Sequence, residues 1–295
     1  FTGSIDHNTA LRAKAQLKRL QLTESGLFSG TDRIHCSDES QIFAELGIQY
    51  IPPECRENQN ELEFNDFSSL ITNKQIQGVF HAHSTFSDGA NSIEEMANAC
   101  IAKNLNYLAL TEHSKTSFYA NGLKEERLIS YFAKIDQINT KLFPFRILKG
   151  IECDILNDGQ LDFNDDVLSQ FDVVIASVHQ NLKMSEEKAT ERLLKAIENP
   201  YTHILGHLTG RLLLGREGYP LNMKRIIEAC AAHQVAIELN CNPHRLDLDW
   251  RWLKACKTAG VKIVLSPDAH SVFGFEDLQY GLNLAKKGFL TANDI

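Results

Sequence analysis

The sequence predicts an α/β protein whose larger part is a barrel of parallel strands. From Gln77 onward, seven short apolar runs alternate with amphipathic, helix-like stretches. Such alternation implies parallel strands joined by crossover helices, and seven units in succession favour a barrel over an open sheet. The preceding residues follow a different pattern. The predicted division is a small α/β unit over residues 1–62, a linker over 63–75 and the barrel over 76–295.

The composition is that of a globular protein without a membrane-spanning segment. The chain has 295 residues, of which 43% are hydrophobic, and no apolar run approaches the roughly 18 residues that a membrane span needs. No signal peptide is evident at the start, so a cytoplasmic location is expected. The net charge of −8 argues against a broad basic surface for duplex DNA. The seven cysteines are scattered, so neither disulfides nor a thiolate zinc site is expected.

Three regular elements are expected in the first sixty residues. They are a helix over 7–20, a short strand over 22–28 that ends in a turn at Gly26 or Gly30, and a short helix over 38–46. Pro52 and Pro53 then interrupt regular structure. The stretch 57–75 is rich in Glu, Asn, Gln and Ser, and it is expected to be a connector with at most one helical turn.

The seven apolar runs are the predicted strands of the barrel. They cover residues 79–80, 107–110, 146–151, 173–178, 203–206, 235–240 and 262–265. Between them, apolar side chains at helical spacing predict the crossover helices. Ser92 and Glu95 have the spacing of a capping box at the start of the first of these helices.

Histidines and carboxylates follow the ends of these strands. His81 and His83 are two residues apart on a strand, so both project from one face, and the next turn can bring Asp88 back toward them. The carboxyl ends of the strands of an α/β barrel share one rim, where residues distant in sequence converge. The candidate metal ligands are His81, His83, Asp88, His113, Glu152, His179, His207, Asp268 and His270.

These candidates are too many for one tetrahedral ion. Imidazole and carboxylate ligands without thiolate suit zinc, manganese or iron. Two or three such ions can generate hydroxide at neutral pH and hold the entering and leaving oxygens of a phosphoryl transfer. The expected activity is therefore phosphate-ester hydrolysis. The residues expected to carry the catalysis are His81, His83, Glu152, His179 and Asp268.

Other polar residues near the strand ends are candidates for substrate binding. Lys115, Arg211 and Arg245 can neutralise a phosphate or form salt bridges at the rim, and Asn242 can hydrogen-bond substrate or cap a turn. The remaining histidines are assigned by position. His7, His35 and His233 are expected at the surface or as caps, and His203 as a structural residue at the opposite rim. His244 is expected at the same rim as the candidate ligands, where it can either touch substrate or serve as a surface residue.

The motifs at the strand ends resemble those of the polymerase and histidinol phosphatase (PHP) family. They include Thr111-Glu112-His113-Ser114-Lys115, Gly206-His207-Leu208-Thr209-Gly210-Arg211 and Ser266-Pro267-Asp268-Ala269-His270-Ser271. The resemblance implies a distorted seven-stranded barrel with a trinuclear site. It implies one ion at His81, His83, Glu152 and Asp268, a second at Glu152, His179 and His207, and a third at Asp88, His113 and His270. Val79 and Leu208 depart from the family pattern, but neither removes a ligand.

The first sixty residues resemble the last subdomain of family X DNA polymerases, which closes over the incoming nucleotide. The resemblance rests on Phe1-Thr2-Gly3-Ser4, Asn8, Arg12 and the later Leu46-Gly47-x-x-Tyr50-Ile51-Pro52-Pro53-Glu54. It implies that Phe1 and Gly3 pack against the nucleotide sugar, that Asn8 reaches the base and that Arg12 approaches the template. The catalytic carboxylates of that family lie upstream of this turn. We therefore expect a fragment that lacks the N-terminal polymerase core and binds nucleotide weakly.

Three functions are compatible with these patterns. The preferred one is a 3'-5' exonuclease or DNA 3'-end processing activity in repair, with two or three divalent ions as cofactors and single-stranded or gapped DNA as the partner. It combines the intact ligand set with the nucleotide-closing subdomain. The alternatives are a small-molecule phosphatase of the histidinol phosphate type and a non-catalytic scaffold whose metals only stabilise the fold.

Overall fold

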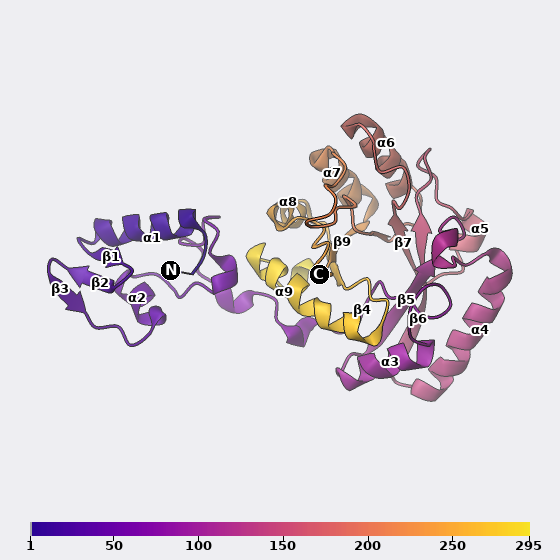
Figure 1. Ribbon diagram of the computed structural model, residues 1–295, viewed down its shortest axis with the longest axis horizontal. Coiled ribbons are helices and arrows are strands. Elements are labelled where there is room, and N and C mark those ends of the chain that lie inside the picture. The colour runs from indigo at the N-terminus through magenta and orange to yellow at the C-terminus, as the bar shows by residue number, and fades with distance from the viewer. Residues whose placement is uncertain (1) are drawn as a thin grey trace.

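The computed structural model describes residues 2–295, in which a small N-terminal unit extends from one side of a larger barrel (Figure 1). Phe1, which was predicted to contact a nucleotide sugar, lies outside the described residues. In the described part of the chain, no helix is long and apolar enough to cross a membrane.

The N-terminal unit consists of two helices and a small antiparallel sheet. Helix α1 (Ile5–Leu17) begins at Ser4, whose Oγ accepts a hydrogen bond from the backbone N–H of His7, and α2 (Glu39–Glu45) begins at Asp38 in the same way. The sheet has the order β1 (Gln21–Thr23), β2 (Gly26–Ser29) and β3 (Asp32–Ile34). Both predicted helices are therefore confirmed, with small shifts in their ends.

The prediction of a single strand over 22–28 was wrong, because the chain reverses within it. Thr23 pairs with Gly26 across a tight turn, and Leu22 lies opposite Leu27 in the hairpin. Gly26 has a φ of 136°, a backbone conformation that other residues rarely adopt. Pairing places Leu22 and Leu27 on the same face, where both are buried in the core of this unit.

His7 was expected at the surface or as a cap, and this prediction was also wrong. Its side chain is 1% exposed, and its Nδ1 lies 2.7 Å from Oε1 of Glu61. Glu61 in turn accepts hydrogen bonds from the backbone N–H groups of Asn58 and Gln59. The pair thus connects α1 to the end of the N-terminal unit through a buried polar contact.

The predicted linker packs against both parts of the chain. It contains two short 3₁₀ helices, Phe67–Ser69 and Asn73–Gln75, after an earlier one at Pro53–Cys55. The rings of Phe64 and Phe67 contact the ring of Phe289, which follows the last helix of the barrel, α9 (Leu278–Lys287). Lys286 of α9 also pairs with Glu54 at 3.1 Å. The domain boundary at residues 63–75 remains a prediction, but these contacts join the two parts closely.

The seven predicted barrel strands are confirmed. They are β4 (Gly78–Val79), β5 (Tyr107–His113), β6 (Arg146–Asp154), β7 (Val173–Ser177), β8 (Ile204–Leu205), β9 (Ala236–Asn240) and β10 (Ile263–Ser266). Within residues 2–295 they form one sheet in sequence order, and every neighbouring pair is parallel. Just beyond β4 and β10, a bridge between Ala82 and Ala269 brings the two edges together, with His83 N donating to Ala269 O at 2.9 Å.

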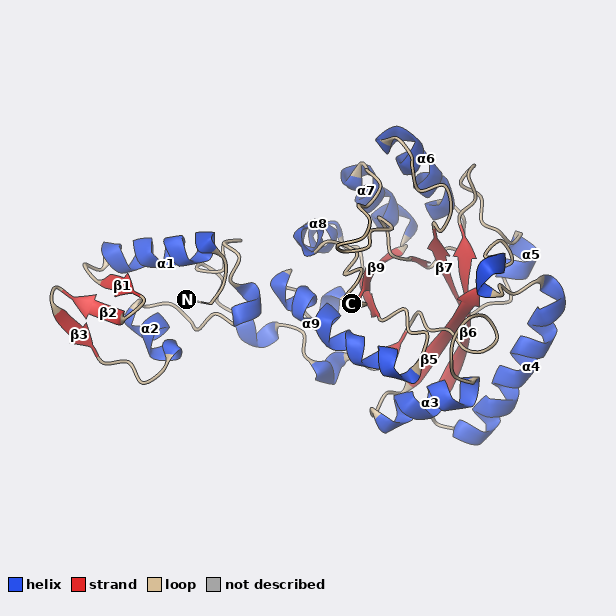
Figure 2. Ribbon diagram, viewed as in Figure 1, coloured by secondary structure: helices blue, strands red, loops and turns tan. Residues whose placement is uncertain are grey.

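Helices cover the outside of the barrel (Figure 2). They are α3 (Ile93–Ala102), α4 (Glu125–Leu142), α5 (Asp165–Leu168), α6 (Glu186–Ile197), α7 (Met223–His233), α8 (Leu253–Ala259) and α9. The capping box at the start of α3 is confirmed, since Ser92 and Glu95 exchange both hydrogen bonds. Ala109, Val173, Ile175 and Ile204 form a separate apolar cluster. Because side chains alternate along strands, this cluster lies on the same strand face as Glu152 of β6, below the polar rim.

Candidate metal centre

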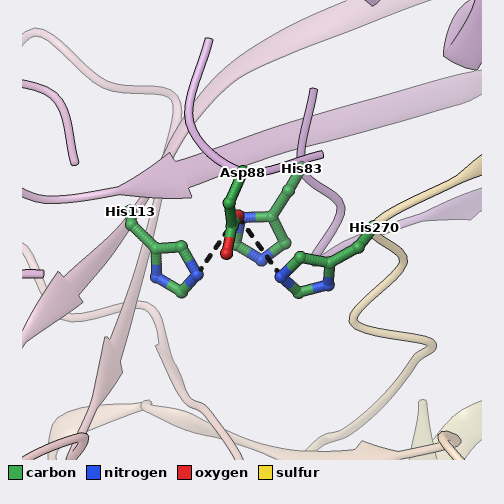
Figure 3. A group of neighbouring side chains, drawn as sticks. All are labelled: His83, Asp88, His113 and His270. Atoms are coloured by element: carbon green, nitrogen blue, oxygen red, sulfur yellow. Dashed lines mark ion pairs between the residues drawn. The ribbon is translucent and has the colours of Figure 1, made fainter. Parts of the chain in front are cut away.

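The nine predicted ligands lie together at the carboxyl ends of the barrel strands. They form overlapping groups in which one nitrogen or oxygen of each residue lies within 4.8 Å of the others. The groups are His83, Asp88, His113 and His270; His81, His83 and Asp268; His81, Glu152 and His207; and His113, Glu152 and His179. Figure 3 shows the first group, whose side chains come from the turn after β4, the end of β5 and the segment after β10, and face a common centre.

Glu152 at the end of β6 occupies the middle of the cluster. Its Oε1 lies 2.8 Å from Nε2 of His207, 3.2 Å from Nε2 of His179 and 3.3 Å from Nε2 of His81. Its Oε2 lies 3.0 Å from Nδ1 of His113. Burial alone raises the pKa of Glu152, but the surrounding imidazoles hold it well below the ordinary value. Glu152 is therefore ionised and can bridge neighbouring cations.

Asp268 and Asp88 supply carboxylates on the side of the cluster nearest β4. Asp268 Oδ1 lies 3.3 Å from Nε2 of His83 and 3.4 Å from Nε2 of His81. Asp88 Oδ1 lies 3.4 Å from Nε2 of His270 and 3.6 Å from Nε2 of His113, as the dashed lines in Figure 3 mark. The expected return of Asp88 toward this strand end is observed for His83, which belongs to the same group as Asp88, whereas His81 does not.

Several buried polar atoms of the cluster have no hydrogen-bond partner among residues 2–295. They are His81 Nε2, His83 Nδ1 and Nε2, His113 Nδ1, His207 Nδ1 and Glu152 Oε2. Each buried polar atom without a partner lowers the stability of the fold by roughly 1–3 kcal/mol. A group of them in one place therefore indicates that something else satisfies these atoms. Divalent cations fit the donor set, because imidazole nitrogens and carboxylate oxygens are the ligands that zinc, manganese and iron take.

The pKa values of the histidines depend on the balance between burial and the charged groups around them. Burial lowers the pKa of His83 to about 3, which keeps its imidazole neutral and able to ligate. Burial alone also lowers the pKa of His270, but its contacts with Asp88 and Asp268 raise it to about 9. The carboxylates of the cluster thus attract positive charge, as a cation site must.

Three of the predicted ligands have an unusual backbone. His81, His207 and Asp268 adopt φ values of 66°, 22° and 53°, which are uncommon for residues other than glycine. Each lies just beyond the end of a strand, where the chain leaves the sheet. Because such conformations cost free energy, they are typical of sites where side-chain direction matters more than stability.

Two buried carboxylates that sequence analysis missed support the ligand histidines. Glu238 in β9 lies with Oε1 2.5 Å from Nδ1 of His81, and it also accepts hydrogen bonds from the backbone N–H of His207 and from Ser266 Oγ. Asp154 in β6 lies 2.7 Å from Nδ1 of His179. Such partners orient a ligand imidazole and fix its tautomer. For Glu238, a carboxylate inside an otherwise apolar strand was the available signal.

A third buried carboxylate, Glu112, holds the turn between His83 and Asp88. It accepts hydrogen bonds from the backbone N–H and the hydroxyl group of both Ser84 and Ser87. Glu112 is fully buried, and burial raises its pKa. The motif that contains it was noted, but its role in this turn was not predicted.

The predicted substrate residues differ in how close they come to the cluster. Arg245 Nε lies 3.5 Å from Asp268 Oδ2, so this guanidinium adjoins the ligands. The guanidinium of Arg211 instead donates to the carbonyl oxygens of Arg245 and Leu246 and to Asp249 at 2.8 Å. Arg211 therefore braces the loop that carries Arg245.

The other two predicted substrate residues make local contacts. Lys115 pairs with Glu125 at 2.5 Å and lies 5.0 Å from the ring centre of Phe163. Asn242 Oδ1 accepts a hydrogen bond from the backbone N–H of His244 at 2.9 Å, which is the turn-capping alternative. His203 Nδ1 accepts a hydrogen bond from Val174 N, in keeping with its expected structural role.

The residues predicted to contact nucleotide or template lie at the start of the N-terminal unit. Gly3 has a φ of 110°, and a Cβ atom there would come within 2.5 Å of Arg56 Cβ. Asn8 Nδ2 donates to the carbonyl oxygen of Ser4 at 2.9 Å. Arg12 Nη2 lies 3.7 Å from Glu24 Oε1 in an exposed ion pair. The structure brings Gly3 and Asn8 to the same end of α1 and leaves Arg12 one turn further on.

Comparison with known proteins identifies both parts of the chain. Residues 1–57 match the family model of the DNA polymerase beta thumb, and residues 80–242 match the PHP domain. Over its whole length the chain is 42% identical to the protein named DNA polymerase/3'-5' exonuclease PolX of Bacillus subtilis, and it spans 52% of that protein. It is 31% identical over 65% of its length to a probable phosphatase of Caldanaerobacter subterraneus, 76% of which is covered.

A solved structure supports the same assignment at the level of the fold. The histidinol phosphate phosphatase of Lactococcus lactis, crystallised with zinc, L-histidinol and phosphate, aligns with 75% of this chain and 98% of its own. The TM-score is 0.55 and the sequence identity 20%. Together, the parallel barrel, the polar cluster at its rim and the sequence matches show that the chain belongs to the PHP domain family, with a polymerase thumb domain before the barrel.

Proposed function

We propose that this chain is the metal-dependent phosphoesterase part of a family X DNA polymerase, and that it removes nucleotides from the 3' ends of single-stranded or gapped DNA. The observation that carries the proposal is the cluster of nine imidazole and carboxylate side chains around Glu152. The printed name of the Bacillus subtilis relative includes a 3'-5' exonuclease, and this relative is similar along the whole chain. A role in DNA repair follows as part of the proposal.

The proposed ligands are the nine residues of the cluster, with zinc, manganese or iron as the ions. Two or three divalent ions there would lower the pKa of water and offset the charge of the phosphate under attack. Glu152 is proposed to bridge them, because both of its oxygens face imidazoles. The catalytic set is His81, His83, Glu152, His179 and Asp268.

The residues of the chain itself supply orientation and charge. Glu238 is proposed to accept a hydrogen bond from Nδ1–H of His81, which leaves the lone pair of Nε2 facing the cluster, and Asp154 to do the same for His179. Arg245, beside Asp268, is proposed to bind a non-bridging phosphate oxygen. Gly3, Asn8 and Arg12 are proposed to approach nucleotide or template when the rest of the polymerase is present.

The test is the release of nucleotides from a 5'-labelled single strand in the presence of manganese, with elemental analysis of the purified protein. We expect a His81→Ala, His83→Ala variant to lose at least about 100-fold in rate, since both imidazoles face the carboxylates of the cluster. A His35→Ala, His233→Ala variant is the matched control, because both residues are exposed and outside the cluster. Wild-type activity no higher than that of the first variant would contradict the proposal.

The assay also separates the alternatives. Several relatives are described as probable phosphatases, so p-nitrophenyl phosphate is included as a small monoester. Turnover of this monoester without attack on DNA would favour the small-molecule phosphatase. Bound metal without hydrolysis of either substrate would favour the scaffold.

A further inference from the structure

A cavity of about 600 Å³ lies beside the metal centre and has His179 in its wall. His179 Nε2 is 3.2 Å from Glu152 Oε1, so the wall of the cavity is also part of the ligand cluster. The rest of the wall includes Asn157, Asn181, Lys183, Lys188 and Arg216. Any molecule that fills this space therefore adjoins the proposed site of reaction.

The charge of this cavity differs from that of the chain as a whole. Among the described residues that line it are three cations and no carboxylate, although the chain carries a net charge of −8. A larger cavity of about 790 Å³ is lined by four carboxylates, those of Asp162, Asp165, Asp166 and Glu198, together with two lysines. Positive charge without compensation is thus concentrated in the cavity next to His179, which we call the basic cavity.

The two lysines of the basic cavity are available to a ligand. Both are exposed, and within residues 2–295 neither has a carboxylate within 4.0 Å. Other lysines near the rim are engaged, such as Lys115 with Glu125. Arg216 is held differently, because its Nε and Nη2 donate to the carbonyl oxygen of Gly210 at 3.1 Å and 2.7 Å. Its guanidinium is fixed in place in the cavity wall.

We propose that the basic cavity binds the phosphate next to the scissile one in a nucleic acid strand. The inference rests on the proposed phosphoesterase function and specifies its substrate class, a strand with consecutive phosphodiesters. A small monoester has a single phosphate, which must occupy the metal centre and leaves Lys183, Lys188 and Arg216 without a partner. A strand places a second phosphate one nucleotide away, where these cations replace its counterions.

The first test measures binding without hydrolysis. A fluorescently labelled single strand with phosphorothioate linkages is titrated with the metal-loaded protein at several salt concentrations, and affinity is read from anisotropy. Each phosphate that is no longer neutralised on a single strand reduces the slope of log affinity against log salt by about 0.7. Lys183 and Lys188 face one phosphate, so Lys183→Gln, Lys188→Gln should reduce the slope by about 0.7 at most. At about 0.15 M salt this corresponds to a loss of roughly fourfold in affinity relative to 1 M salt. Arg216 is left intact because it supports Gly210.

The matched control is Lys224→Gln, Lys254→Gln. It removes two exposed lysines from α7 and α8 and makes the same change of charge. We expect the control to keep the slope of the wild type. An unchanged slope in the Lys183→Gln, Lys188→Gln variant, or an equal decrease in both variants, would overturn the assignment.

The second test compares two substrates. The Lys183→Gln, Lys188→Gln variant should lose about fourfold in kcat/KM on the single strand through a higher KM. It should keep its rate on bis(p-nitrophenyl) phosphate, which has one phosphate only. Equal losses on both substrates would indicate damage to the metal centre and would overturn the assignment. A wild-type protein that hydrolyses neither substrate would contradict the proposed function, and the salt slope would then still decide on the basic cavity.

Discussion

Replacing Glu112 by Gln should destabilise the turn that carries Asp88. The carboxylate accepts hydrogen bonds from the backbone N–H groups of Ser84 and Ser87 at 3.1 Å and from both hydroxyl groups at 2.5 Å. An amide keeps one acceptor oxygen and presents an NH₂ group to the remaining donors. A serine hydroxyl can rotate to accept from this NH₂ group, but a backbone N–H cannot.

The expected loss follows from the number of bonds. Hydrogen bonds to a charged group contribute about 1.5–3 kcal/mol each, and two of them are lost or weakened. The free energy of unfolding should therefore fall by roughly 3–6 kcal/mol in E112Q. For a barrel of this size each kcal/mol lowers Tm by about 2–4 °C, so a decrease of roughly 10 °C is expected. Metal content should fall as well, because the turn positions Asp88 relative to His83.

Thermal unfolding followed by circular dichroism, with elemental analysis after dialysis, measures both effects. E95Q is the matched control, because Gln at this position of the exposed capping box still accepts a hydrogen bond from Ser92. The free energy of unfolding of E95Q should differ from that of the wild type by less than about 0.5 kcal/mol. The competing state is a protonated Glu112, since burial raises the pKa of this carboxyl. An E112Q protein with the Tm and metal content of the wild type would refute an ionised acceptor at this position.

Three further predictions concern other contacts. E238Q replaces the carboxylate beside His81 Nδ1 by a weaker hydrogen-bond acceptor. Metal affinity, measured against a competing chelator, should fall by about 10–100-fold. An E238Q protein that is less stable but binds metal with the affinity of the wild type would contradict the orienting role of Glu238. In F289A, removal of a half-buried ring that contacts Phe64 should cost roughly 1–3 kcal/mol and increase proteolysis of residues 57–66, with no effect on metal content. Burial alone raises the pKa of Glu61, but hydrogen bonds from His7 and nearby backbone N–H groups hold it below its ordinary value of 4.5. A lowered carboxyl pKa stabilises the fold above the unfolded-state pKa, and this contribution is lost as the pH falls through the folded-state value. Urea unfolding should therefore show E61Q less stable than the wild type at pH 7, with a difference that narrows below about pH 4.5. A difference in stability between E61Q and the wild type that stays the same at all pH values would show that the charge of Glu61 does not cause it.

The barrel was predictable because its signals are local. Each apolar run between amphipathic segments became a parallel strand, and the ends differed by a few residues, as for the run 203–206, of which Ile204–Leu205 is the strand. The hairpin at Gln21–Ser29 was missed because Glu24 and Ser25 at its turn are a much weaker turn signal than the Asn-Gly pair that is common in hairpins. His7 was misplaced because its partner, Glu61, lies 54 residues away.

The amino-acid order alone determined which side chains reach the rim. A strand end followed by His, Asp or Glu points these groups to one edge of a parallel barrel, whatever the lengths of the helices between. Only the tertiary structure decided how they share space: that Glu152 lies between the imidazoles of His81 and His113, and that Glu238 orients His81. Periodicity is encoded by neighbours along the chain, but distances between strand ends depend on how the barrel closes, which no local pattern specifies.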